Sequence, residues 1–447
     1  MSGPEVITLG CRLNIAESEA MRQLAAGEDD LIIVNSCAVT NEAVRQTRQA
    51  IRRAKRARPD ARVVVTGCAA EVEPEAFAAM VEVDRVIRNP DKLTRALLED
   101  TVRAEPVEVL PLSFAAPEEG KGGLRQAQAE RWGFSPSFTN TRRSDSRVAR
   151  EAAPHLASYT DRSRAFVAVQ NGCDHRCTFC IIPYGRGDSR SVPAGLVVER
   201  IKALAGEGFR EVVLTGVDVT SYGPDLPGAP SLGLLIERIL RHVPDLPRLR
   251  LSSLDCIEID ARLEEIICHE PRFMPHLHMS FQAGDDMVLK RMKRRHSRAQ
   301  AVETVQRLKA KRPELAIGAD LIAGFPTETE AMHENSVALV EECDIVMGHV
   351  FPYSAKAGTP AARMPQVPAA AIKERARRLR EACARQRRMW LEGLVGSRQQ
   401  VLAERGGSGH AENFAPVRLP DGLGAVGEIV PVRIAAVEGD RLVGVAA

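Results

Sequence analysis

Three cysteines stand close together in the middle of the chain: Cys173, Cys177 and Cys180. The segment around them reads Gln170-Asn-Gly-Cys-Asp-His-Arg-Cys-Thr-Phe-Cys-Ile, and the next cysteine lies far along the chain. A structural zinc site is closed by four protein ligands, whereas three thiolates on one loop hold three irons of a cubane iron–sulfur cluster and leave the fourth iron open. An open iron can bind a substrate. The alternative is a zinc knuckle completed by His175 or by a distant cysteine.

A second set of cysteines, Cys11, Cys37 and Cys68, is spread over the first part of the chain. Each closely follows an apolar segment rich in β-branched residues, and helical patterns at residues 17–24 and 41–58 separate these segments. Strands alternating with helices of this length predict a parallel sheet, and the carboxyl ends of its strands meet at one edge. The fold can therefore bring the three thiols together. The alternative is that each thiol is a small buried apolar group.

Length and composition favour several domains and no membrane segment. The chain has 447 residues, a net charge of +2, 44% hydrophobic residues and ten cysteines. It has no long uncharged apolar stretch, and its first residues lack a secretory pattern, so we expect a cytoplasmic protein. In that reducing compartment, clustered cysteines are ligands or reactive thiols rather than disulfides. Basic runs at residues 45–58, 290–298 and 373–388 are either solvated helix faces or part of a surface for RNA.

Residues 106–160 predict a linker, partly disordered, because proline, glycine and polar residues interrupt every periodic pattern there. The linker separates an N-terminal domain at residues 1–105 from a central domain at residues 161–390. Six candidate strands follow it, beginning near Ala165, Glu211, Leu249, His276, Ile317 and Ile345, with helical patterns between most of them. Six β/α repeats predict a partial barrel with its functional loops at the carboxyl ends of the strands. The 173–180 loop directly follows the first strand.

The C-terminal residues 395–447 predict a small all-β domain. A helical pattern at residues 373–394 precedes short β-like runs that begin at Gln400, Ile429 and Arg441. This tail contains one aromatic residue, Phe414, and few basic residues, so its composition gives little support for RNA binding.

These segments together resemble the methylthiotransferase family of radical S-adenosylmethionine (SAM) enzymes. The C-x3-C-x2-C spacing with Phe179 before the last cysteine is similar to a radical SAM cluster loop, and Thr8-Leu-Gly-Cys-Arg-Leu-Asn, Asn35-Ser-Cys-Ala-Val-Thr-Asn and Thr66-Gly-Cys-Ala-Ala resemble the N-terminal motifs. Segments at residues 214–218, 280–286, 320–329 and 352–364 resemble motifs of the barrel. The resemblance implies an α/β fold: an N-terminal parallel-sheet methylthiotransferase domain, a central radical SAM partial (β/α)6 barrel, and a small C-terminal all-β TRAM-like domain that holds RNA. The segment at residues 112–146 is longer than the usual family linker.

The family has three bacterial branches, which act on isopentenyladenosine in tRNA, on threonylcarbamoyladenosine in tRNA, or on an aspartate of a ribosomal protein. The sequence most resembles the threonylcarbamoyladenosine branch in four segments: Cys11-Arg-Leu-Asn, the Asp-His-Arg that follows Cys173, residues 181–191 and residues 291–296. The resemblance therefore implies conversion of N6-threonylcarbamoyladenosine at tRNA position 37 to its 2-methylthio derivative. The other two branches remain alternatives, and a non-catalytic zinc-binding RNA adaptor is a remote one.

The implied reaction replaces the hydrogen on carbon 2 of adenine, which is neither acidic nor hydridic. General acid–base groups cannot remove it, so a radical is required, and no catalytic side chain is assigned beyond the cluster ligands. The resemblance implies two [4Fe-4S] clusters, one on Cys173, Cys177 and Cys180 that binds SAM, and an auxiliary one on Cys11, Cys37 and Cys68. It also implies tRNA, an external flavodoxin- or ferredoxin-like reductant and a sulfur donor as partners, and no membrane.

Contacts to SAM are expected near the carboxyl ends of the barrel strands, although each candidate is equally open to a role in core packing. The candidates are Phe179, Ile181, Gly216, Asp218, Ser252, Gln282 and Tyr353. Arg186 and Arg190 follow the cysteine loop and are candidates for tRNA phosphate or the SAM carboxylate, with surface ion pairing as the alternative. The cysteines outside both sets, and His278, are expected to be packing residues.

Overall fold

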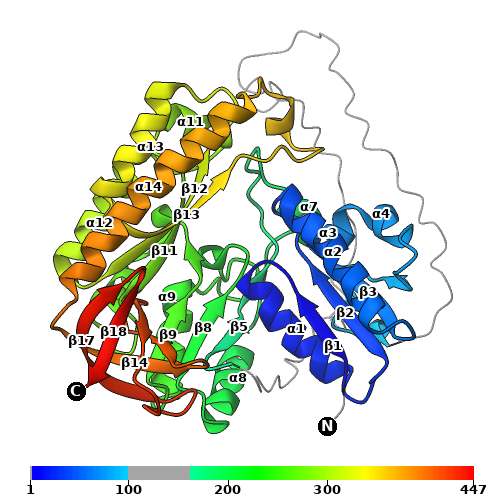
Figure 1. Cartoon of the computed structure of the whole chain (residues 1–447), viewed down its shortest axis with the longest axis horizontal. Helices are drawn as coiled ribbons and strands as arrows, with labels where there is room; N and C mark the ends of the chain where they lie inside the picture. The colour runs from blue at the N-terminus through cyan, green and yellow to red at the C-terminus, as the bar shows by residue number, and fades with distance from the viewer. Residues whose placement is uncertain (1–2, 99–161) are drawn as a thin grey trace. The chain divides into compact units, whose positions relative to one another are not determined.

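The N-terminal part is a parallel sheet with helices between its strands. The computed structural model describes residues 3–98 and 162–447, so most of the predicted linker lies outside the described residues (Figure 1). The sheet has the order β1-β2-β3-β4, and its strands pair in parallel. The elements are β1 (Glu5–Thr8), α1 (Arg12–Leu24), β2 (Leu31–Ser36), α2 (Asn41–Ala57), β3 (Arg62–Gly67), α3 (Cys68–Val72), α4 (Pro74–Ala78) and β4 (Arg85–Val86).

Local sequence explains these elements. Every residue of β2 is buried, as a central parallel strand requires. The Thr40 side chain accepts a hydrogen bond from the Ala43 amide and caps α2, which buries one face at helical spacing. Helix α1 begins at Arg12, earlier than the predicted residue 17, because the Asn14 side chain donates to the carbonyls of Leu9 and Ser36 and fixes the first turn. The prediction of strands alternating with helices is confirmed.

The central part contains all six predicted barrel strands. They are β5 (Ala165–Ala168), β8 (Glu211–Thr215), β9 (Arg248–Leu251), β11 (His276–Gln282), β12 (Ala316–Ala323) and β13 (Ile345–Pro352). All pair in parallel, and the short β10 (Ser253–Leu254) continues β9 and joins it to β11. The helices are α8 (Ala194–Gly206), α9 (Leu232–His242), α10 (Ala261–His269), α11 (Asp286–Met292), α12 (Arg298–Lys311) and α13 (Glu330–Glu342).

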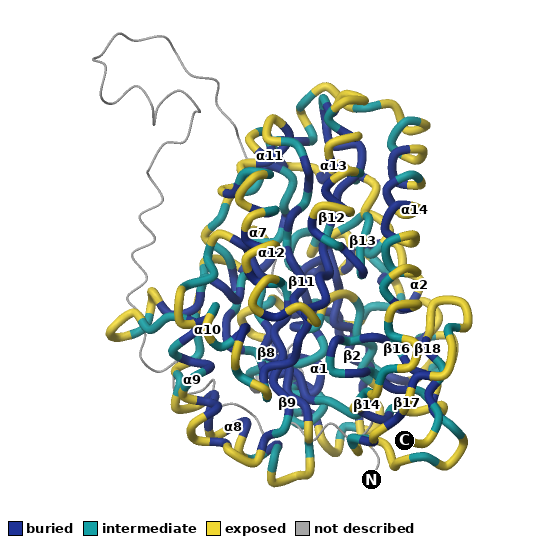
Figure 2. The backbone as a smooth tube through the Cα atoms, turned by 90° about the vertical axis from the view of Figure 1, so that its left-hand side faces the viewer, coloured by how far each residue is buried: buried dark blue, intermediate teal, exposed yellow. Residues whose placement is uncertain are grey.

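The strands have two different faces because side chains alternate along a strand. Leu277, Met279 and Phe281 of β11 belong to the large core shared with the surrounding helices. The residues that alternate with them, such as His276 and His278, point to the opposite side, the inside of the partial barrel. Figure 2 shows buried chain along β8 and β11 and exposed stretches on the helices outside them.

The tail is a closed β-barrel that follows α14 (Ala369–Gly393). Its strands are β14 (Arg398–Glu404), β15 (Ser408–His410), β16 (Pro416–Arg418), β17 (Ile429–Glu438) and β18 (Arg441–Ala446), in the order β14-β15-β16-β18-β17. The sequence predicted three of these strands and missed β15 and β16, which are too short to show alternation. The predicted fold class is confirmed. Across the described ranges no helix combines the length and apolar character that a membrane crossing demands.

Candidate functional site

The central cysteine loop runs from β6 (Gln170–Asn171) to α7 (Ile182–Arg186) and carries Cys173, Cys177 and Cys180. All three thiols are free and partly exposed. Burial raises the pKa of Cys173 and that of Cys180 to about 12, so the thiolates need a positive partner. Gly172, at φ +75°, makes the turn into the loop, and a Cβ there would lie 1.9 Å from the Asp188 carbonyl oxygen.

The other three cysteines stand at the carboxyl edge of the N-terminal sheet. Cys11 precedes α1, Cys37 follows β2, and Cys68 follows β3. Burial, together with the smaller effects of the nearby Cys11 and Cys68, raises the pKa of Cys37 to about 11. Gly67, at φ +93°, approaches the Ser36 backbone so closely that a Cβ would lie 2.5 Å from its nitrogen. The structure therefore brings the three thiols together where the sheet argument placed them.

Arg186, at the end of α7 just after the central cysteine loop, reaches the N-terminal set of cysteines. Its Nε donates to the Cys68 sulfur at 3.1 Å, and its other nitrogens donate to Glu17, Asn14 and Asn171 at 2.5–3.0 Å. Each of the five guanidinium N–H groups thus has an acceptor. Cys68 also contributes to the raised pKa of Cys180, after burial and Cys177, so the two sets lie within electrostatic reach of each other.

The burial of Arg186 corrects the sequence prediction. We expected an accessible residue for tRNA phosphate or the SAM carboxylate, but its side chain is 2% exposed and all its donors are used. Burial alone would raise the pKa of Glu17, but Lys92 and Arg186 together lower it to about 2. Sequence reasoning could not find this network because Glu17 and Lys92 carry no motif. Arg190 is exposed, and its guanidinium donates only to the Arg186 carbonyl among the described residues.

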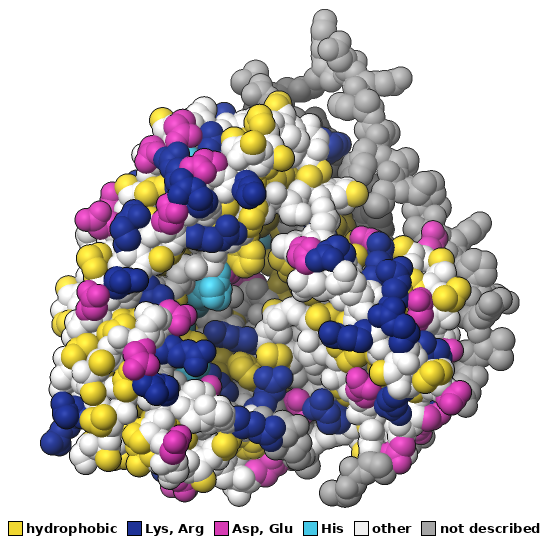
Figure 3. Space-filling model, viewed as in Figure 1, with side chains coloured by type: hydrophobic (Ala, Val, Ile, Leu, Met, Phe, Trp, Pro, Cys, Tyr) yellow, Lys and Arg dark blue, Asp and Glu magenta, His cyan; other side chains and the backbone are white. Residues whose placement is uncertain are grey.

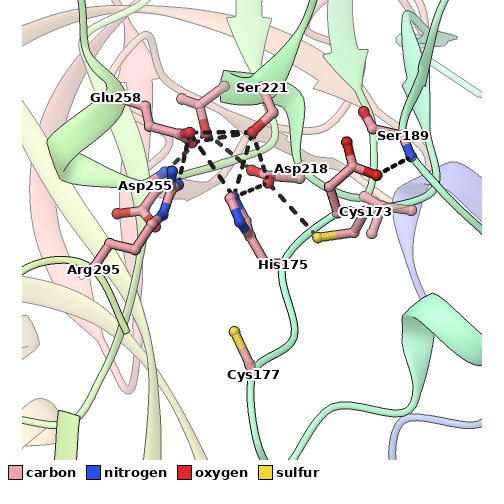
Figure 4. Close-up of polar contacts among 12 residues, drawn as sticks. Cys173, His175, Cys177, Ser189, Asp218, Ser221, Asp255, Glu258 and Arg295 are labelled. Carbon is pink, nitrogen blue, oxygen red and sulfur yellow. Dashed lines mark hydrogen bonds and ion pairs between the residues drawn. The ribbon is translucent and has the colours of Figure 1, made fainter. Parts of the chain in front are cut away.

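A polar group adjoins the first cysteine of the loop (Figure 4). His175 Nε2 lies 2.8 Å from Asp218 Oδ2, and the Ser221 hydroxyl donates to the same oxygen at 2.9 Å. The Cys173 sulfur is 3.7 Å from this oxygen. Burial tends to raise the pKa of Asp218, but the hydrogen bonds from His175 and Ser221 lower it overall. His175, a possible fourth ligand in the zinc alternative, is therefore engaged with a carboxylate.

Gln170 fixes the turn that contains Gly216. Its side-chain oxygen accepts from the amides of Val217 and Asp218 at 3.0 and 2.9 Å. Its side-chain nitrogen donates to the Gly172 carbonyl at 2.7 Å. The predicted SAM turn is present, but these two amides bind Gln170, so they are not donors for a cofactor. Sequence analysis missed this role of the glutamine at the end of the first barrel strand.

Three of the remaining SAM candidates, Phe179, Tyr353 and Ser252, offer an aromatic wall or an unpaired hydroxyl. Phe179 and Tyr353 both make edge contacts with Phe325, with ring centroids 6.5 and 5.6 Å apart, and the buried Tyr353 hydroxyl has no hydrogen-bond partner among the described residues. Ser252, at the junction of β9 and β10, likewise has a buried, unpaired hydroxyl. These orphaned hydroxyls are free to bind a ligand.

Ile181 differs from its prediction. Its side chain is 6% exposed and belongs to the core of the N-terminal sheet, because the segment after the cysteine loop packs on α3. Gln282 ends β11 at φ +66°, where the strand pairing shifts register. Arg294, which the sequence did not suggest, places Nη1 3.8 Å from the Cys177 sulfur and Nη2 2.9 Å from Asp255.

Two parts of the chain match described protein families: residues 167–340 match the radical SAM superfamily, and residues 5–88 match uncharacterized protein family UPF0004. A protein from Rickettsia prowazekii named threonylcarbamoyladenosine tRNA methylthiotransferase MtaB is 46% identical over 437 residues, which cover 97% of this chain and 95% of that protein. The chain belongs to the radical SAM methylthiotransferase family, MtaB type. The MtaB of Aquifex aeolicus is 34% identical over 96% of this chain and 98% of its own length.

A member of another branch of the family also matches over nearly its full length. A tRNA-2-methylthio-N(6)-dimethylallyladenosine synthase of Cereibacter sphaeroides is 30% identical over 98% of this chain and 97% of that protein. The chain is an enzyme of the methylthiotransferase family, and the cofactors expected from the sequence, SAM and two [4Fe-4S] clusters, are confirmed as those of the family.

Proposed function

We propose that this enzyme replaces the C2 hydrogen of N6-threonylcarbamoyladenosine at position 37 of tRNA with a methylthio group. The observation that carries the proposal is the proximity of two three-cysteine sets that are far apart in sequence, since Cys68 of one set contributes to the raised pKa of Cys180 in the other. The names of the MtaB relatives support the choice of substrate.

The donor chemistry of both sets fits iron–sulfur clusters. Each set offers three free thiols, and burial disfavours the charge of Cys37, Cys173 and Cys180 unless a metal compensates for it. We assign Cys173, Cys177 and Cys180 to the cluster that binds SAM, and Cys11, Cys37 and Cys68 to the auxiliary cluster. When bound, the clusters and SAM supply one-electron reduction, hydrogen abstraction and a transferable sulfur.

The protein's own groups position these thiols and shape the cavity. Gln170 joins the cysteine loop to the turn at Asp218, and His175 holds that carboxylate in place. Arg186 orients Cys68. The aromatic group at Phe179 and Tyr353 excludes water from one wall, which protects a radical reaction from side reactions.

Several finer assignments belong to the same proposal. We infer that Arg190 contacts tRNA and that Asp218, Ser252, Gln282, Tyr353, Phe179 and Gly216 line the SAM pocket. The domain division at residues 1–105, 106–160, 161–390 and 395–447 is part of it. The reaction needs a flavodoxin- or ferredoxin-like reductant and a sulfur donor, and a tRNA substrate places the enzyme in the cytoplasm.

Mass spectrometry of tRNA nucleosides from a deletion strain tests the proposal. We expect the 2-methylthio derivative of threonylcarbamoyladenosine to disappear and its unthiolated precursor to accumulate, and the plasmid-borne gene to reverse both changes. Loss of the methylthio group from isopentenyladenosine or from a ribosomal aspartate, with threonylcarbamoyladenosine unaffected, would instead assign the enzyme to another branch.

A further inference from the structure

Arg12 is a cation without an anionic partner beside the second set of cysteines. It directly follows Cys11 and is the first residue of α1. Within residues 3–98 and 162–447, no carboxylate lies within 4.0 Å of its guanidinium and no hydrogen bond engages it. It lies over the ring of Phe414, 6.0 Å from the centroid.

The other arginines around this ring are paired. Arg164 and Arg250 lie 5.2 and 5.0 Å from the Phe414 centroid. Both form ion pairs with the buried Glu211, at 2.9 and 3.0 Å. Arg248 approaches the second oxygen of Glu211 at 3.5 Å. Glu211 is therefore shared among three guanidiniums, and Arg12 is outside that network.

The charge of Arg12 is incompletely balanced. The carboxylates of Asp320 and Glu211, two acidic groups of its surroundings, pair with other side chains rather than with Arg12. Asp320 already has closer partners, because its Oδ1 lies 3.0 Å from His278 and 3.3 Å from His349. An anion brought to Arg12 would meet a half-buried positive charge with unused hydrogen-bond donors.

A cavity of about 650 Å³ shares Phe414 with the surroundings of Arg12, although Arg12 is not one of its lining residues. Phe414, His349 and His410 are among its lining residues. The volume is in the range that accommodates a nucleoside-sized ligand. Figure 3 shows Lys and Arg side chains around a hollow on this face of the molecule.

We propose that Arg12 binds the carboxylate of the N6 substituent of the target adenosine and thereby selects substrates that carry one. The inference rests on the proposed function. A threonylcarbamoyl group has a single carboxylate, whereas an isopentenyl group has none. In adenine, one ring nitrogen separates C6, which bears the substituent, from C2, so a residue next to an auxiliary-cluster ligand is well placed for this contact. The planar guanidinium fork matches a carboxylate with two hydrogen bonds.

The test compares two anticodon stem-loop RNAs in the reconstituted enzyme with both clusters. One carries threonylcarbamoyladenosine, and the other carries the same group with a carboxamide in place of the carboxylate. We expect Arg12→Gln to lower kcat/KM for the carboxylate RNA roughly 10- to 100-fold, chiefly through KM, and to weaken its binding without reductant by a similar factor. The carboxamide RNA, already poor with the unchanged enzyme, should respond little to the substitution. Arg12→Lys should retain part of the preference.

Controls separate recognition from a structural role. Arg22→Gln, on the same helix but paired with Glu19, should change neither RNA's kinetics. Equal losses on both RNAs, or iron loss in Arg12→Gln, would overturn the proposal. So would full recovery of the carboxylate preference in Arg12→Gln/Asp320→Asn, since Arg12 would then merely balance Asp320. An unchanged enzyme that thiolates only an isopentenyladenosine RNA would defeat the proposed function itself, which is a distinct result.

Discussion

At the scale of single residues, Arg186 holds a cysteine that is more than a hundred positions away in the chain, because its Nε donates to the Cys68 sulfur. The same side chain balances the buried Glu17 together with Lys92. Buried charges of this kind are tolerated only when each has a partner. The site is thus held together by charge pairing as well as by packing.

Replacing Arg186 should be costly for stability. Arg186→Gln leaves Glu17 with one cation in place of two, and we expect the free energy of unfolding of the iron-free protein to fall by about 3–5 kcal/mol in denaturant titrations. Arg190→Gln is the matched control, since Arg190 is exposed, and it should change stability by less than about 0.5 kcal/mol. Similar values for both variants would contradict the role given to Arg186.

The two sets of cysteines should be separable. Cys177→Ala removes a ligand from the SAM-binding set only, so iron should fall from about eight to about four per chain and SAM cleavage should cease. Cys268→Ala, in the buried core away from both sets, should keep the full iron content. Iron and sulfide analysis after anaerobic purification measures both. Stoichiometric zinc without iron in the unchanged protein would contradict the cluster assignment.

At the scale of elements, the turn between β12 and α13 depends on Glu328. Its carboxylate accepts from the Gly324 amide at 2.8 Å and from Arg375 of α14 at 3.1 Å. Burial raises the pKa of Glu328 to about 7, although Gly324 and Arg375 oppose the rise. The turn should therefore be sensitive to pH near neutrality.

The sign of this sensitivity follows from the raised pKa. Between pH 4.5 and 7 the folded state binds a proton that the unfolded state has released, so this contribution to stability is present in acid and is lost as pH rises through 7. Glu328→Gln should remove this pH dependence of the free energy of unfolding. The difference in the free energy of unfolding between the unchanged protein and the variant should therefore change by about 3 kcal/mol between pH 5 and 8. Denaturant titrations across that range measure it. The control is Glu341→Gln, an exposed residue of α13, which should leave the original pH dependence. A Glu328→Gln variant whose stability changes with pH as that of the unchanged protein does would refute the assignment.

At the scale of the whole molecule, arginines of the partial barrel hold the tail. Arg250 donates to the carbonyls of Ala411 and Glu412, and Arg248 donates to that of Gln400. Arg164 pairs with Glu404. All three arginines surround Glu211, so one buried carboxylate supports the junction between the barrel strands and the tail.

Loss of Glu211 should weaken that junction. Burial alone would raise the pKa of Glu211, but Arg250 and Arg164 lower it to about 2, so its stabilisation is present above pH 4.5 and is lost only as pH falls toward 2. We expect Glu211→Gln to lower the free energy of unfolding at pH 7 by about 3–5 kcal/mol. Glu199→Gln, an exposed residue of α8, serves as the control. Limited proteolysis should release the tail faster in Glu211→Gln, and an unchanged rate would contradict the role of the junction.

The sequence alone determined the longer strands of the sheet and the barrel, the order of the domains and the two sets of cysteines, because hydrophobic periodicity and short motifs are properties of neighbouring residues. It placed all six barrel strands and put Cys11, Cys37 and Cys68 at one sheet edge. The tertiary structure decided that Arg186 is buried, that Ile181 packs into the N-terminal core, and that Arg12 faces the Phe414 ring. The physical reason is that burial and charge pairing depend on groups distant in the chain, and no local pattern records which distant groups will meet.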